Sequence, residues 1–160
     1  MGILEEVMGQ GEVSVLVVNS DSGMREYLCE LLPDAGVNPI CSDSIRCALE
    51  KIAELHVDAI ICDERLKDGF GIELVERLRR CGSKAPVAML LSGNPGISEI
   101  SALARGADLV FQKPFGLQDF IDGIQTLIGY ADERIPSADS LNAQSAWSST
   151  DSTRNSPHRA

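Results

Sequence analysis

Short apolar runs alternate with helix-like segments along most of this chain. Five runs are dense in Val, Ile and Leu without polar alternation, which is typical of strands buried on both faces of a parallel sheet. They lie at 13–18, 37–41, 59–62, 87–91 and 109–111. The pattern therefore predicts a sheet of five parallel strands.

Five amphipathic segments follow these runs, one after each. Apolar residues recur at helical spacing in 24–32, 45–52, 72–78, 97–104 and 117–128. Pro33 and Gly36 mark the end of the first segment, and Ser44 is one of the cap candidates for the second. Strands that alternate with helices imply right-handed crossovers and helices on both faces of the sheet. We therefore expect an α/β fold of the (βα)5 type, doubly wound.

Composition changes at both ends of this pattern. Residues 1–12 form an extension before the first strand, and 131–160 are rich in Ser, Asn, Asp and Ala without periodicity. The segment 131–160 is typical of a disordered tail, in which Trp147 is either an unstructured remnant or a docking anchor. The expected domain therefore covers 13–130.

Charge and cysteine content narrow the classes of protein. The 160 residues carry a formal net charge of -10, which argues against nucleic-acid binding. No apolar run approaches the roughly 20 residues that span a bilayer, and the acidic start is unlike a secretory signal. The five cysteines form no C-x-x-C pair, and three of them sit in apolar-patterned segments, which indicates small buried side chains in a reducing compartment. We expect a cytoplasmic protein that contacts neither nucleic acid nor membrane.

Polar side chains stand just beyond four of the predicted strands. Asn19, Ser20 and Asp21 follow the first, Asp63 the third, Ser92 the fourth and Lys113 the fifth. Functional groups of parallel sheets gather at the carboxyl ends of the strands, so we expect these side chains to share one pocket.

The chemistry of such a pocket is narrow. A carboxylate beside a fixed ammonium group stays ionised and can act as a nucleophile toward phosphorus. The acyl phosphate formed at Asp63 would gain roughly one to two negative charges, which Lys113 and a divalent cation would balance. The Ser92 hydroxyl would donate to a phosphoryl oxygen.

At these residues the chain resembles the receiver domains of two-component response regulators. The motifs are "DAIICDERLKDGFGIELVERLR", "PVAMLLSG" and "ARGADLVFQKPF". The resemblance implies a flavodoxin-like, CheY-like fold with strand order 2-1-3-4-5. It also implies that Asp63 is the phospho-acceptor, that Ser92 and Lys113 bind the phosphoryl group, and that Lys113-Pro114 is a cis peptide. The implied donor is a histidine kinase or phosphotransfer protein, with Mg²⁺ as cofactor.

The acidic pair of this family is replaced here. Family members usually carry two adjacent acids after the first strand, where this chain has Asn19 and Ser20. Mg²⁺ usually takes one or two carboxylates, so its remaining ligands would be Asp63, the Arg65 carbonyl and Asp21. Asp21 could equally cap the first helix. We expect weak Mg²⁺ binding.

The position that couples activation to the surface also departs from the family. Three residues before Lys113, where relatives have Tyr or Phe, stands Val110. The aromatic readout is therefore missing, or Phe111 substitutes for it poorly. Two simpler interpretations remain: Ser92 as a turn former and Asp63 as a surface or capping acid.

Two functions from different classes follow. The first is a non-enzymatic receiver that takes a phosphoryl group on Asp63 and signals to a downstream protein through its last two helices, with homodimerisation possible. The second is a pseudo-receiver, a binding module that works without phosphorylation. An aspartyl phosphatase would need an acid two residues after its nucleophile, where Arg65 stands.

Overall fold

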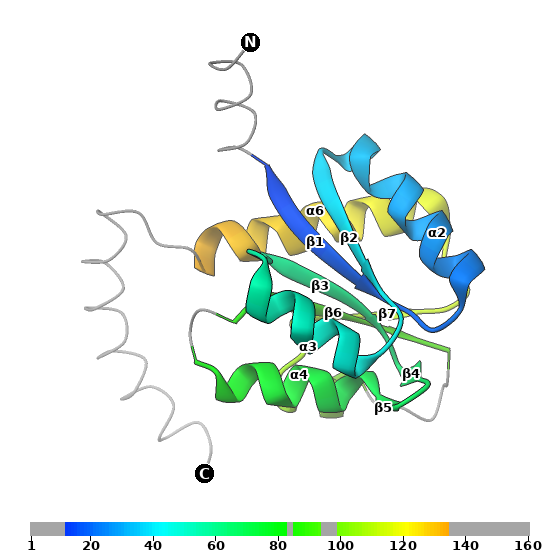
Figure 1. Cartoon of the computed structure of the whole chain (residues 1–160). Coiled ribbons are helices and arrows are strands. Elements are labelled where there is room, and N and C mark those ends of the chain that lie inside the picture. Colours follow the sequence, from blue (N-terminus) through cyan, green and yellow to red (C-terminus); the bar gives the residue numbers. More distant parts are fainter. Residues whose placement is uncertain (1–11, 83–84, 94–98, 135–160) are drawn as a thin grey trace.

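The computed structural model of this chain describes residues 12–82, 85–93 and 99–134 (Figure 1). The elements, in chain order, are β1 (Val13–Val18), α2 (Ser22–Leu31), the 3-10 helix η1 (Leu32–Ala35), β2 (Val37–Ser42), α3 (Ile45–Glu54), β3 (Ala59–Asp63), β4 (Arg65–Leu66), β5 (Gly69–Phe70), α4 (Gly71–Arg80), β6 (Val87–Ser92), α5 (Glu99–Ala104), β7 (Leu109–Gln112) and α6 (Leu117–Arg134).

The main sheet has five parallel strands in the order β2-β1-β3-β6-β7. This order confirms the expected doubly wound (βα)5 fold, because the first strand lies between the second and third. Each predicted apolar run forms one of these strands. The Lys113-Pro114 peptide is cis, as the resemblance implies.

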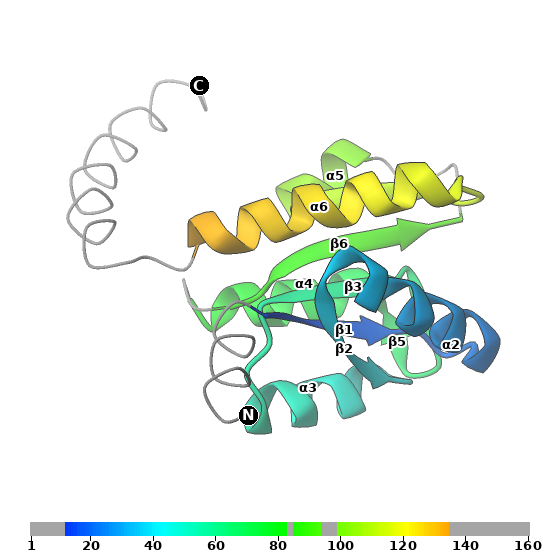
Figure 2. The same ribbon diagram turned by 90° about the horizontal axis from the view of Figure 1, so that it is seen from above.

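Helices cover both faces of the sheet (Figure 2). One face packs against α2 and α6 through a core that includes Leu28, Phe120 and Ile124. The other face packs against α3, α4 and α5, with Leu74 and Ala102 among its buried residues. The central strands have fully buried apolar residues on both faces, so the sheet lies at the centre of the hydrophobic core.

Two helices differ from the sequence pattern. On α5 the large apolar residues Ile100 and Leu103 are exposed, and the small residue Ala102 is buried instead. Ile97, expected in the same stripe, lies outside the described residues. The last helix runs past the expected boundary at 130, because Ala131 is buried in the core and α6 continues to Arg134. The rest of the tail expected at 131–160, from 135 onward and including Trp147, lies outside the described residues.

A small hairpin separates β3 from α4. Strands β4 and β5 pair antiparallel, an element that the apolar pattern does not predict. Gly71 then begins α4 directly behind β3. A Cβ at this position would overlap the carbonyl oxygen of Asp63, and Gly71 N–H donates to the Glu64 carbonyl at 2.9 Å. Only glycine allows the helix to start so close to this strand.

The expectation of small buried side chains holds for only some of the cysteines. Cys62 is fully buried, and burial together with the neighbouring Asp63 carboxylate raises the pKa of its thiol far above the ordinary range. Cys81 is exposed and Cys47 half-buried. The structure joins Cys29 to Cys41 by a disulfide between α2 and β2, so the prediction of free thiols is wrong for this pair.

None of the described helices is both long and apolar enough to cross a membrane.

Candidate functional site

Asp63 and Lys113 meet at the carboxyl end of the sheet. The neighbouring strands β3 and β6 place Asp63 opposite Leu91, and β6 and β7 place Ser92 opposite Gln112. The Lys113 N–H donates to the Ser92 carbonyl at 2.7 Å, which fixes the start of the lysine loop. The Lys113 ammonium forms an ion pair with the Asp63 carboxylate, whose side chain is only 13% exposed. The structure thus brings this pair together as the sequence predicts.

The Ser92 hydroxyl has a partner that the sequence analysis missed. Ser92 is fully buried, and its Oγ donates to Glu64 Oε1 at 3.4 Å. The same carboxylate oxygen accepts the backbone N–H of Gly93. An acid immediately after a buried strand was the available signal for Glu64.

The replaced acidic-pair positions hold the surrounding loops instead. Asn19 is buried; its side-chain oxygen accepts the Asp21 N–H at 2.9 Å, and its Nδ2 has no hydrogen-bond partner among the described residues. The Ser20 hydroxyl donates to the Asp43 carbonyl at 3.0 Å and accepts the Lys67 N–H at 2.8 Å. Ser20 therefore links the loops after β1, β2 and β4.

Asp21 is a helix cap. Its Oδ1 accepts the N–H groups of Gly23 at 2.9 Å and Met24 at 3.3 Å, which satisfies the first turn of α2. Of the two roles that the sequence leaves open for this side chain, the structure has the cap. The Oδ1 atom of Asp21 is thus engaged by backbone N–H groups.

The described residues do not fit an ordinary Mg²⁺ site. Mg²⁺ prefers octahedral oxygen ligands with one or two carboxylates. Asp63 is paired with Lys113, Asp21 caps α2, and the unpartnered atom of Asn19 is an N–H donor rather than a ligand. Within the described ranges, no group of three or more His, Cys, Asp or Glu side chains could hold a metal ion.

Arg65 lies on the small hairpin beside the site. Its guanidinium stands 5.8 Å from the centre of the Phe70 ring, a cation–π contact between β4 and β5. Lys67 forms an ion pair with Asp43 at 2.8 Å, and this hydrogen bond lowers the pKa of Asp43 below its ordinary value. Metal coordination by the Arg65 carbonyl stays a prediction.

Val110 and Phe111 lie on opposite faces of the sheet. Val110 packs with Leu90 and Ala102 on the α5 side. Phe111 packs on the α6 side, where its ring centre lies 5.9 Å from that of Phe120 in an edge-to-face contact. The idea that Phe111 substitutes for an aromatic residue at 110 does not agree with this packing, because the ring faces away from the Ser92 side.

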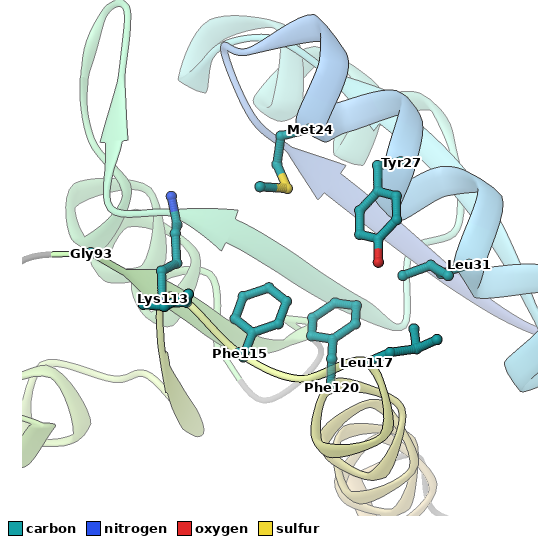
Figure 3. Close-up of a pocket in the computed structure, with 9 residues that line it drawn as sticks. Met24, Tyr27, Leu31, Gly93, Lys113, Phe115, Leu117 and Phe120 are labelled. Atoms are coloured by element: carbon teal, nitrogen blue, oxygen red, sulfur yellow. The ribbon is translucent and has the colours of Figure 1, made fainter.

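An open, largely apolar cavity of about 480 Å³ lies beside the lysine, between α2 and the start of α6 (Figure 3). Figure 3 shows Lys113 at one end and the rings of Phe115 and Phe120 along its floor. These two rings stack with centres 4.8 Å apart. Lining residues are Met24, Tyr27, Leu31, Gly93, Lys113, Pro114, Phe115, Leu117 and Phe120.

Asp68 has a structural role beyond the turn before Gly69. Its carboxylate oxygens accept the N–H groups of Ile45 at 2.9 Å and Arg46 at 3.0 Å, at the start of α3. Burial opposes ionisation of this carboxyl, but these backbone donors outweigh it, so the pKa of Asp68 lies below its ordinary value. Spacing in the sequence does not indicate that the carboxylate of Asp68, far along the chain, accepts the N–H groups at the start of α3.

Comparison with known proteins places this chain in a family. The family model for the response regulator receiver domain matches residues 15–125, and the chain belongs to that family. Receiver domains are signalling modules, and members generally bind Mg²⁺ at an acidic pocket. The assignment agrees with the resemblance in the three sequence motifs.

The relatives include transcriptional regulators of which only a part is matched. The KDP operon transcriptional regulatory protein KdpE of Escherichia coli is 34% identical over 104 residues, covering 65% of this chain and 46% of that protein. Response regulator MprA of Mycolicibacterium vanbaalenii is 29% identical, covering 72% of this chain and 50% of that protein. The chain spans about half the length of the curated relatives it matches.

Solved structures agree on the fold. A putative response regulator from Chloroflexus aurantiacus superposes with a TM-score of 0.68 at 27% identity, covering 74% of this chain and 98% of that one. The non-phosphorylated HemR receiver domain from Leptospira biflexa gives 0.66 at 26% identity, covering 73% and 94%.

Proposed function

We propose that this chain accepts a phosphoryl group on Asp63 from a histidine kinase or a phosphotransfer protein in a cytoplasmic phosphorelay. The observation that carries the proposal is the ion pair between Asp63 and Lys113 at the carboxyl ends of β3 and β7. It places a carboxylate at the point where a strand ends, next to the ammonium group of a lysine.

The transfer would proceed by attack of an Asp63 oxygen on the phosphorus of a phosphohistidine. The P–N bond breaks with its electron pair passing to the imidazole nitrogen, which takes up a proton, and a P–O bond forms to Asp63. Lys113 would then balance the added phosphoryl charge. Before transfer Lys113 is paired with the Asp63 carboxylate that reacts. The lysine would therefore lie beside the phosphoryl group during and after the transfer.

The surface beside the site supports contact with a donor protein. Tyr27 and Leu117 are 47% and 50% exposed at the rim of the cavity between α2 and α6. Exposed aromatic and aliphatic side chains next to a reactive group are typical of a protein interface. Output, or homodimerisation, would use the surface of α5 and α6, where Ile100 is 80% exposed.

One set of observations favours a second function, that of a pseudo-receiver. Asn19 and Ser20 hold loops rather than a cation, and Val110 provides no ring to turn. A domain of this kind would bind its partner whether or not Asp63 carries a phosphoryl group.

Labelling with acetyl phosphate or beryllofluoride, over a range of Mg²⁺ concentrations, separates the two functions. The receiver proposal predicts a phosphorylated species by intact-mass spectrometry in the wild type and its loss in Asp63→Asn. No labelling at any Mg²⁺ concentration, with partner binding retained, would favour the pseudo-receiver.

A further inference from the structure

Glu64 is a buried acid next to the proposed acceptor, and the proposed transfer does not use it. The residue is 7% exposed. Its backbone is held on both sides, since its N–H donates to the Leu91 carbonyl at 2.9 Å and its carbonyl accepts the Gly71 N–H at 2.9 Å. The side chain therefore leaves from a fixed point at the end of β3.

The Glu64 carboxylate is held by two donors from the end of β6. Oε1 accepts the Gly93 N–H and, at 3.4 Å, the Ser92 hydroxyl. A buried carboxylate is stable only where such donors replace its hydration, and hydrogen bonds to a charged acceptor are stronger than neutral ones. The contact therefore keeps Ser92 and Gly93 engaged while Asp63 is unmodified.

A phosphoryl group on Asp63 would compete for the same donors. Carboxylate and phosphoryl oxygens are both anionic acceptors, and the expected partner of a phosphoryl oxygen at this site is the Ser92 hydroxyl. The phosphoryl group would also add roughly one to two negative charges beside a buried carboxylate, and like charges at short range in a partly desolvated site repel.

We infer that Glu64 is an internal occupant of the phosphoryl-binding donors and acts as a brake on phosphorylation of this chain. The inference rests on the proposed function of Asp63. Formation of the acyl phosphate requires the Glu64 carboxylate to release Ser92 and Gly93 and turn toward solvent. A phosphoryl donor with a high group-transfer potential, or a partner protein that draws the Glu64 side chain toward solvent, would overcome the brake.

The test compares wild type with Glu64→Gln, which keeps the shape and removes the charge, and Glu64→Met, which also removes the acceptor. Glu50→Gln is the matched control, because it removes the same charge from an exposed side chain on α3. Initial rates of acetyl phosphate labelling and the affinity for beryllofluoride are measured for each protein. The Gly93 amide resonance in ¹H–¹⁵N spectra reports the Glu64 contact directly.

Both Glu64 variants should be labelled by acetyl phosphate roughly five- to tenfold faster than wild type, and should bind beryllofluoride more tightly by a similar factor. Glu50→Gln should behave as wild type in both measurements. Beryllofluoride should move the Gly93 resonance of wild type toward its position in Glu64→Met. Equal or slower labelling of both variants, with wild type still labelled at Asp63, would overturn the brake alone. If neither wild type nor variants label, the acceptor proposal and the brake both fail. Thermal unfolding of each protein identifies a variant that has lost its fold, and the second variant then decides.

Discussion

Lys113 and Asp63 form an ion pair across the ends of β7 and β3, with both side chains largely withdrawn from water. Removing one partner leaves the other charge partly buried without compensation, which costs more than the pair contributes. We expect Lys113→Met to lower the free energy of unfolding by roughly 1–3 kcal/mol.

Urea unfolding of Asp63→Asn, Lys113→Met and the double variant measures the coupling between the two residues. The double variant should be more stable than the sum of the single effects indicates, by roughly 1–2 kcal/mol. If the effects of the two single substitutions on the free energy of unfolding simply add in the double variant, the result would contradict an interaction between Asp63 and Lys113.

Metal binding should improve when the acidic pair is restored. Asn19→Asp with Ser20→Asp adds two carboxylates to a site whose own acids are engaged elsewhere, and we expect Mn²⁺ to bind about tenfold or more tightly than to wild type. Electron paramagnetic resonance of free Mn²⁺ measures this. Asp21→Asn is the control and should leave metal affinity unchanged, because that carboxylate caps α2. Millimolar or tighter binding by wild type would contradict the prediction.

Lowering the pH should destabilise the start of α3. Because the folded pKa of Asp68 is depressed, its contribution to stability is fully present above the unfolded pKa of about 4 and is lost as the pH falls through the folded value. Asp68→Asn should therefore lower the free energy of unfolding near neutral pH, by about 1 kcal/mol if it acts as an ordinary cap, and less at acidic pH. Unfolding curves across the acid range test this, and a pH-independent difference would contradict it.

Two glycines of α6 should respond in opposite ways to alanine. A Cβ at Gly123 would lie 2.5 Å from Phe111 Cε1, so Gly123→Ala should destabilise the fold by roughly 1–3 kcal/mol. No atom of the described residues lies within 4 Å of a Cβ at Gly129, so Gly129→Ala should stabilise it by roughly 0.5–1 kcal/mol through helix propensity. Thermal melts compare the two. Adding Phe111→Leu to Gly123→Ala should recover part of the loss.

The cysteines should separate by reactivity in the native, unreduced protein. Cys81 is exposed and should be alkylated first by iodoacetamide, whereas burial and the raised pKa of Cys62 keep its thiol unreactive at neutral pH. Cys29 and Cys41 should react only after reduction. Peptide mass spectrometry reads each position, and alkylation of Cys29 without reductant would contradict the cross-link.

The strands and the Asp63–Lys113 pair could be predicted because buried parallel strands are nearly pure apolar runs and functional groups follow their carboxyl ends. Contacts decided by side-chain direction could not. Nothing in the sequence indicates that Ser20 bridges the Asp43 and Lys67 backbones, or that Asp68 reaches Ile45. These depend on loop geometry, which local patterns do not encode.

The exposed face of α5 marks another limit. A helical stripe predicts which residues of a helix form an apolar side, but not which of them the fold turns toward the sheet. The structure buries Ala102 and leaves Ile100 to solvent.

The absence of a side chain at Gly71 has a mechanical consequence. With only a hydrogen atom between the first turn of α4 and the carbonyl of Asp63, no soft layer can absorb a shift of one against the other. A displacement of the Asp63 backbone would therefore bear directly on the first turn of α4.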